Sequence, residues 1–220
     1  MLRRRKSAAA ESEPAHAPEE LPSPGWQAID DALARLYGAQ VPRHVGYMPP
    51  AAFSHNLQGC SAYRAGTHWH FVTYGLSELY VPGPDDDPAH SGWGFELTMR
   101  VPLGEGADPP PWPFTMLNEL AKHVNGNRVL LQEGDRIDLR APATGHPHVP
   151  DAPPTDLTVY VVAADPELGA IETPNGRVAF LQVIGVTAAE KEQMLQSSTA
   201  AVLDQMLASN PSLLTDPGRA

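Results

Sequence analysis

One stretch constrains the fold of this chain more than any other, the aromatic and β-branched run from Thr67 to Tyr80. It reads Thr-His-Trp-His-Phe-Val-Thr-Tyr-Gly-Leu-Ser-Glu-Leu-Tyr, with Ala65-Gly66 before it and Pro82-Gly83-Pro84 after it. Residues of these types pack well on a pleated surface, and turn-forming residues bound the run. Apolar side chains occur at both odd and even positions. The run therefore predicts a central strand covered on both faces.

The other elements suggest what surrounds this strand. From Trp93 to Val101, apolar and polar residues alternate, which predicts a strand that pairs antiparallel with the central run through the acidic loop between them. Further strands are expected at 60–64, 136–139, 157–163 and 177–186, and helices at 23–37, 113–124 and 187–207. Because strands and helices do not alternate regularly, we expect an α+β fold. Its sheet is mixed and mostly antiparallel, with helices at its ends and on one side.

Length and composition favour one globular domain in a reducing compartment. The chain has 220 residues, of which 42% are hydrophobic, and Cys60 is its single cysteine, so no internal disulfide can form. Residues 1–22 are rich in Ala, Glu, Pro and Ser and are expected to be disordered. The domain is placed at 23–207 and a C-terminal tail at 208–220. A signal peptide and a transmembrane segment are not expected, which predicts a cytoplasmic protein.

The charge of the chain points to the kind of partner. The formal net charge is −11, and residues 1–23 are neutral because four basic side chains balance four acidic ones, so the whole charge belongs to the remainder. Such a body repels nucleic-acid phosphate and attracts a basic partner. Ordinary solubility is the alternative explanation of the acidity. Membrane and nucleic-acid partners are not expected.

Metal and catalytic sites have weak support in the sequence. His68 and His70 alternate on one strand face, a spacing that can provide two zinc ligands. No third ligand is nominated by spacing, however, and two hydrogen-bonded structural histidines are the preferred interpretation. Asp85, Asp86 and Asp87 lack the pattern of a calcium loop. Because no recognised catalytic motif occurs, no catalytic residue, metal or cofactor is predicted.

Several sequence blocks carry a family resemblance. Besides the central run, they are Pro24-Gly25-Trp26-Gln27-Ala28-Ile29-Asp30, Ser91-Gly92-Trp93-Gly94-Phe95-Glu96-Leu97-Thr98, Pro111-Trp112-Pro113, Asp165-Pro166-Glu167-Leu168, Thr173-Pro174-Asn175-Gly176 and Phe180-Leu181-Gln182-Val183-Ile184-Gly185-Val186. In this order they resemble the Suppressor of fused family over residues 24–205. The chain looks like the N-terminal domain of the animal proteins and like stand-alone bacterial members.

The resemblance implies a non-enzymatic, protein-binding function. Animal members inhibit transcription factors by clamping an extended peptide through strand addition, and bacterial members are proposed as immunity proteins of polymorphic toxin systems. Family positions that contact the peptide match Tyr80 and Asp87 here, and Glu78, Asp85 and Asp86 are the other candidates for protein binding. We therefore expect an inhibitor of a protein partner, a basic toxin domain or an extended peptide. The alternatives are an adaptor or scaffold, and a metal-dependent hydrolase that uses His68 and His70.

Overall fold

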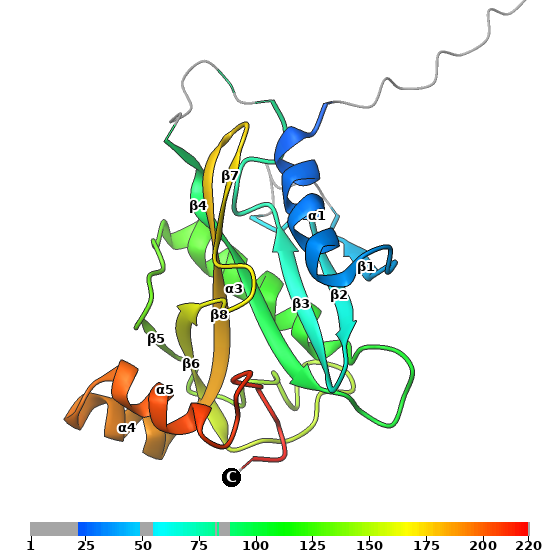
Figure 1. Ribbon diagram of the computed structural model, residues 1–220. Helices are drawn as coiled ribbons and strands as arrows, with labels where there is room; N and C mark the ends of the chain where they lie inside the picture. Colours follow the sequence, from blue (N-terminus) through cyan, green and yellow to red (C-terminus); the bar gives the residue numbers. More distant parts are fainter. Residues whose placement is uncertain (1–21, 49–54, 82, 84–88, 220) are drawn as a thin grey trace, which may run out of the picture.

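The fold is built on one mixed sheet of eight strands (Figure 1). The computed structural model describes residues 22–48, 55–81, 83 and 89–219. The strand order is β1-β2-β3-β4-β8-β6-β5, with β7 also paired to β8. The strands are β1 (Arg43–Gly46), β2 (Gly59–Ala65), β3 (His68–Tyr74), β4 (His90–Pro102), β5 (Arg136–Asp138), β6 (Leu157–Ala164), β7 (Ala170–Thr173) and β8 (Gly176–Thr187). The predicted α+β class is confirmed.

The first half of the central run, His68–Tyr74, forms the strand expected of it, whereas the second half, residues 75–80, is a loop. Every residue of β3 is buried, and β3 lies between β2 and β4. The predicted antiparallel pairing with the next strand is confirmed, and it places His70 opposite Arg100. Among the described strands, only β4 and β8 pair in parallel.

Helices cover both faces of the sheet. The face that carries Val72 and Phe180 packs against α1 (Pro24–Tyr37), and farther along the same face the sheet packs against α4 (Ala188–Gln196) and α5 (Thr199–Leu207). The opposite face, which carries Phe71, packs against α3 (Trp112–Asn127). Helices on one side of the sheet were expected, and α3 adds a layer on the other.

The last helix differs from its prediction. A single helix was expected to run from Thr187 to about Leu207, but the chain forms α4 and α5 with a break between them. A capping box starts α4, since Thr187 and Glu190 satisfy each other's backbone N–H groups. The break arises because the Ser198 side chain accepts from Ala201 N and starts a second helix. On α4, Met194 is buried and the neighbouring Leu195 is 55% exposed.

The two ends of the chain can be compared with the tails expected at 1–22 and 208–220. Residues 1–21 of the segment expected to be disordered lie outside the described residues. Residues 208–219 pack on the sheet: Gln182 Nε2 donates to the carbonyls of Ser212 and Leu213, and Thr215 is fully buried. None of the helices in the described part of the chain has the length and hydrophobicity needed to cross a bilayer.

Candidate functional site

Four of the sequence blocks that carried the resemblance meet around one loop, Gly75–Tyr80, which follows β3: the central run and the blocks at 24–30, 91–98 and 173–176. Leu76 and Leu79 of this loop are buried, each at 2% exposure. Its backbone is held by β4, by the hairpin tip between β7 and β8, and by the start of α1. Figure 1 shows these segments side by side at one end of the sheet. The loop is therefore fixed from several directions.

Glu96 of β4 fixes the first half of the loop. Its carboxylate is fully buried, and Oε1 accepts from the backbone N–H groups of Gly75, Leu76 and Ser77 at 2.8, 3.1 and 2.9 Å. The same oxygen accepts from Ser77 Oγ at 2.7 Å, and Oε2 accepts from Thr73 Oγ1 at 2.6 Å. Burial raises the pKa of Glu96, whereas these donors favour its ionised form. The carboxylate takes the place of a strand partner for the loop.

Three further contacts fix the second half. Ser91 Oγ accepts from Glu78 N at 2.9 Å. Asn175, at the hairpin tip, donates through Nδ2 to the carbonyls of Glu78 and Tyr80 at 2.8 and 2.6 Å. Backbone N–H groups at the start of α1 donate to the Leu79 carbonyl, from Gly25 at 3.1 Å and from Trp26 at 3.3 Å. Free helix N–H groups thus bind the loop.

Two glycines are required by this close packing. A Cβ atom on Gly25 would lie 2.1 Å from the Glu78 carbonyl oxygen. Gly92 has a φ of +57°, and a Cβ there would lie 2.7 Å from the Leu76 oxygen. Both positions therefore need a residue without a side chain. The Pro-Gly-Trp and Ser-Gly-Trp blocks have a structural cause in the loop they enclose.

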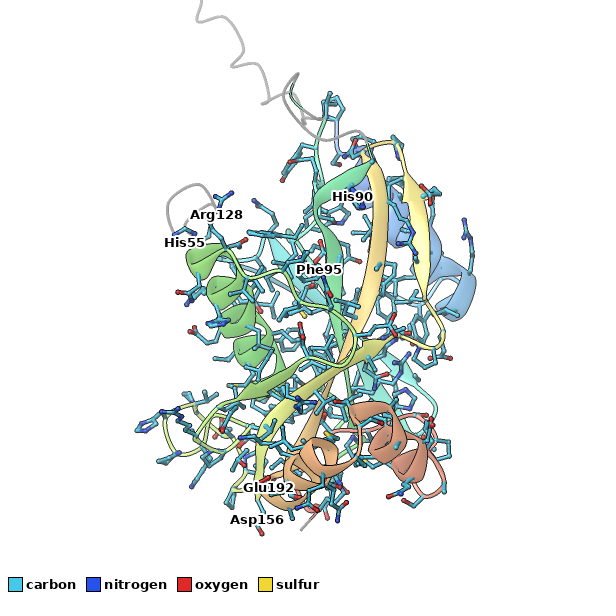
Figure 2. All side chains as sticks on the ribbon, turned by 90° about the vertical axis from the view of Figure 1, so that its left-hand side faces the viewer. His55, His90, Phe95, Arg128, Asp156 and Glu192 are labelled. Atoms are coloured by element: carbon cyan, nitrogen blue, oxygen red, sulfur yellow. The ribbon has the colours of Figure 1, made fainter. Side chains whose placement is uncertain are left out.

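The predicted binding residues are only partly placed. Tyr80 ends the loop and is 36% exposed. Glu78 is half-buried, and its Oε1 accepts from Tyr80 N at 3.1 Å. Asp85, Asp86 and Asp87 lie outside the described residues. The structure therefore brings Glu78 and Tyr80 together at the end of the molecule where β4 begins, marked by His90 in Figure 2.

Sequence reasoning missed a buried polar network on the sheet. Arg100 and Asp165, each 1% exposed, form a two-pronged ion pair with N–O distances of 2.7 and 2.9 Å. Arg100 also donates to Gln182 Oε1 at 2.7 Å and to Glu167 at 2.8 Å. The alternating pattern of β4 is typical of a strand with one solvated face, yet its polar side chains Glu96, Thr98 and Arg100 are buried. Their partners come from distant segments, which a local pattern does not reveal.

The network also uses one of the two histidines considered as metal ligands. His70 Nδ1 lies 2.7 Å from the Tyr37 hydroxyl, and His70 Nε2 lies 3.1 Å from Asp165 Oδ2. Burial alone would raise the pKa of Asp165, but hydrogen bonds from His70 and Arg100 hold it well below its usual range. Since Asp165 is ionised, Nε2 donates to it and Nδ1 accepts from Tyr37. Both ring nitrogens are engaged, so this arrangement gives the metal hypothesis no support.

His68 contrasts with His70. It is 8% exposed, and neither ring nitrogen has a hydrogen-bond partner. Burial, together with the nearby Arg100 charge, lowers its pKa to about 4. Among the residues that the structure describes, no group of three or more His, Cys, Asp or Glu side chains is arranged to hold a metal ion. His68 is therefore a neutral, unpaired histidine within the fold.

Comparison with known proteins agrees with these features. The Suppressor of fused protein (SUFU) family profile matches residues 54–220. The Suppressor of fused homologues of Homo sapiens and Mus musculus are each 31% identical over 166 residues, which cover 69% of this chain and 32% of theirs. The chain thus spans about a third of the length of these curated relatives.

Solved structures give the same result. The crystal structure of the Sufu-Fu complex matches with a TM-score of 0.80 and 28% identity, over 90% of this chain and 92% of that one. Drosophila Suppressor of Fused matches with a TM-score of 0.81 and 28% identity, over 90% of this chain and 51% of that one. A SUFU homologue from Neisseria gonorrhoeae shares the fold, with 16% identity, a TM-score of 0.57, and coverage of 89% and 95%. The chain belongs to the Suppressor of fused family.

Proposed function

We propose that this chain is a non-enzymatic protein-binding domain, and that the Gly75–Tyr80 loop is part of its contact surface. The observation that carries the proposal is the loop's fixed backbone, which ends on the partly exposed Tyr80. A preorganised loop loses little conformational entropy when a partner docks on it. A tyrosine presented in this way offers an apolar ring and a hydroxyl to the partner.

Similarity to Suppressor of fused proteins supports binding as the mode of action. One similar structure is a Sufu protein in complex with Fu. This chain spans only a third of its curated relatives, so the identity of their partners is not transferred to it. What is transferred is the class of activity, recognition of another protein without chemistry.

The finer proposal is that the domain inhibits or sequesters a basic partner in the cytoplasm. The net charge of −11 steers a positively charged protein toward the domain. Glu78, together with Asp85, Asp86 and Asp87, which follow it in the sequence, would supply charge at the contact surface. An immunity protein that blocks a toxin domain fits this description, and an adaptor of the Suppressor of fused type is the second candidate.

Capture from native cytoplasm, and from cells that express toxin domains encoded beside the gene, tests the proposal. We expect one stoichiometric partner, bound about tenfold more weakly by Tyr80→Ala. Leu130→Ala is the control, because Leu130 is also an exposed apolar residue, at 54% exposure, outside the loop.

The outcomes separate the candidates. Loss of the partner's activity on binding supports an inhibitor, and retained activity supports an adaptor. Equal capture by wild type, Tyr80→Ala and Leu130→Ala would remove the loop from the interface. Absence of any partner would contradict the binding function itself.

A further inference from the structure

A second candidate interface lies at the other end of the sheet. A groove of about 270 Å³ runs between α5, the end of β6 and residues 211–213. We call it the α5 groove. Its floor includes the buried side chains of Leu203 and Leu213, and Leu207, 39% exposed, stands at its edge. Figures 1 and 2 show α4 and α5 at the end of the molecule opposite the start of β4.

The edge of β6 leaves backbone groups free in this groove. Val162 pairs outward, because its N–H donates to the Asp135 carbonyl and its carbonyl accepts from Gly134 N. Ala164, two residues farther, points its N–H and carbonyl to the same side, since alternate residues of a strand pair on the same edge. Ala164 pairs with Leu181 of β8 on the inner side, but the outer segment turns away at Glu133 and Gly134, so within the described residues no strand pairs with Ala164 on the outer side, where the residue is exposed.

The rim of the groove is acidic. Glu133 and Asp204 line it, and both residues are exposed. Neither carboxylate makes an ion pair within the described ranges. Arg136, on the neighbouring strand β5, does not pair with either carboxylate; its guanidinium donates to Thr199 Oγ1 at 2.6 Å instead. An apolar floor between two unpaired carboxylates is complementary to an apolar side chain flanked by cations.

We propose that the α5 groove docks an extended segment of a partner protein. The segment pairs its backbone with Ala164 and places one apolar side chain over Leu203 and Leu213. Lysine or arginine side chains on either side of it contact Glu133 and Asp204. This is recognition by strand addition, with main-chain bonds giving affinity and the pocket giving specificity. The interface is separate from the Gly75–Tyr80 loop and does not depend on the function proposed for it.

The first experiment titrates the isotope-labelled full chain with a capped synthetic peptide, Lys-Val-Leu-Val-Lys, followed by NMR. We expect saturable shifts of the amide signals of Glu133, Ala164 and Leu203. A Glu-Val-Leu-Val-Glu peptide should cause none, because its charges repel the rim. A basic peptide methylated on its central backbone nitrogen should bind about tenfold more weakly, since it cannot donate to the strand edge.

Protein variants locate the site. Asp204→Lys should weaken binding of the basic peptide about tenfold, whereas Glu192→Lys, with the same charge change on exposed α4, should leave it within about twofold. Tyr80→Ala should have no effect. Absence of saturable binding, binding of the acidic peptide with equal affinity, or equal weakening by Asp204→Lys and Glu192→Lys would overturn the proposal. None of these results bears on the loop that carries Tyr80.

Discussion

At the scale of single residues, buried polar side chains hold the loop of the candidate site in place. Glu96 satisfies five donors in and beside one loop. An apolar residue there would leave those donors unpaired, at about 1–3 kcal/mol for each buried group. Its position in an alternating strand was visible in the sequence. Its partners were not, because three of the five are backbone N–H groups whose placement depends on the loop.

The cost of burying an unpaired histidine can be measured at His68. The change His68→Leu removes two buried ring nitrogens without partners and should raise the free energy of unfolding at neutral pH by about 1 kcal/mol. His68 is neutral in the folded protein until its pKa of about 4, whereas the unfolded histidine takes up a proton near 6.5. Protonation of His68 therefore costs the folded protein nothing above about pH 6.5, and the free energy of unfolding falls as the pH drops from there toward about 4, because the unfolded histidine takes up the proton first.

Urea unfolding across that pH window measures both effects. The stability of His68→Leu should depend less on pH than that of the wild type. His148→Leu, which changes an exposed histidine in a loop, serves as the control. A His68→Leu protein that is less stable at neutral pH, or that keeps the wild-type pH profile, would contradict the assignment of His68 as unpaired and neutral.

At the scale of elements, the sequence predicted the segments that are rich in apolar residues or whose apolar residues recur at helical spacing. β3, β6 and β8 are of the first kind, and α1 is of the second. β1 was missed because all four of its residues are exposed and show no apolar pattern. The break between α4 and α5 was missed because the helical spacing of apolar residues continues across Ser197 and Ser198, the two serines at which one helix ends and the next begins.

The candidate site was predictable only in part, for a related reason. The resemblance nominated Tyr80 and Asp87, and Glu78 was a further candidate two residues before Tyr80 on the same short segment. That the hairpin tip at Asn175 and the start of α1 hold this segment depends on tertiary packing. Asn175 and Glu78 are 97 positions apart in the chain, so no local pattern relates them.

A mutation at the hairpin tip can test whether the tip holds the loop without affecting the rest of the fold. Asn175→Ala removes two hydrogen bonds to the Glu78 and Tyr80 carbonyls. Amide hydrogen exchange should accelerate about tenfold in Leu76–Tyr80, because losing a hydrogen bond costs about 1 kcal/mol, and should not change in β8.

Asn127→Ala, at the exposed end of α3, is the matched control for this measurement, since the side-chain hydrogen bonds of Asn127 within the described residues go to His123. Acceleration throughout the sheet would mean that Asn175 supports the whole fold. Unchanged exchange in the loop would mean that the hairpin tip does not hold it.

At the scale of the whole molecule, net charge governs how a partner approaches. Replacing Asp85, Asp86 and Asp87 by Asn removes three negative charges from the sequence that follows the loop. If a basic partner docks there, association should slow by about tenfold at low salt and should depend less on ionic strength. Stopped-flow mixing at several salt concentrations measures this effect.

A triple variant with the same charge change separates local from global attraction. Glu105→Gln, Asp156→Asn and Glu192→Gln alter three exposed acids elsewhere on the chain. They should slow association much less than the triple Asn variant does. Equal slowing by both variants would assign the effect to total charge, and an unchanged rate would remove the acidic segment from the encounter.

The parallel contact between β4 and β8 has a consequence for how the molecule is made. It joins an antiparallel half, β1 to β4, to a second half that ends in β8, and it pairs Thr98 with Gln182. Each half can form from strands that are close in sequence. Pairing β4 with β8, however, closes a long loop of the chain, and such closure slows folding. During synthesis the first half emerges with an open edge on β4 and waits for β8. Until then, that edge can be captured by a strand of another chain.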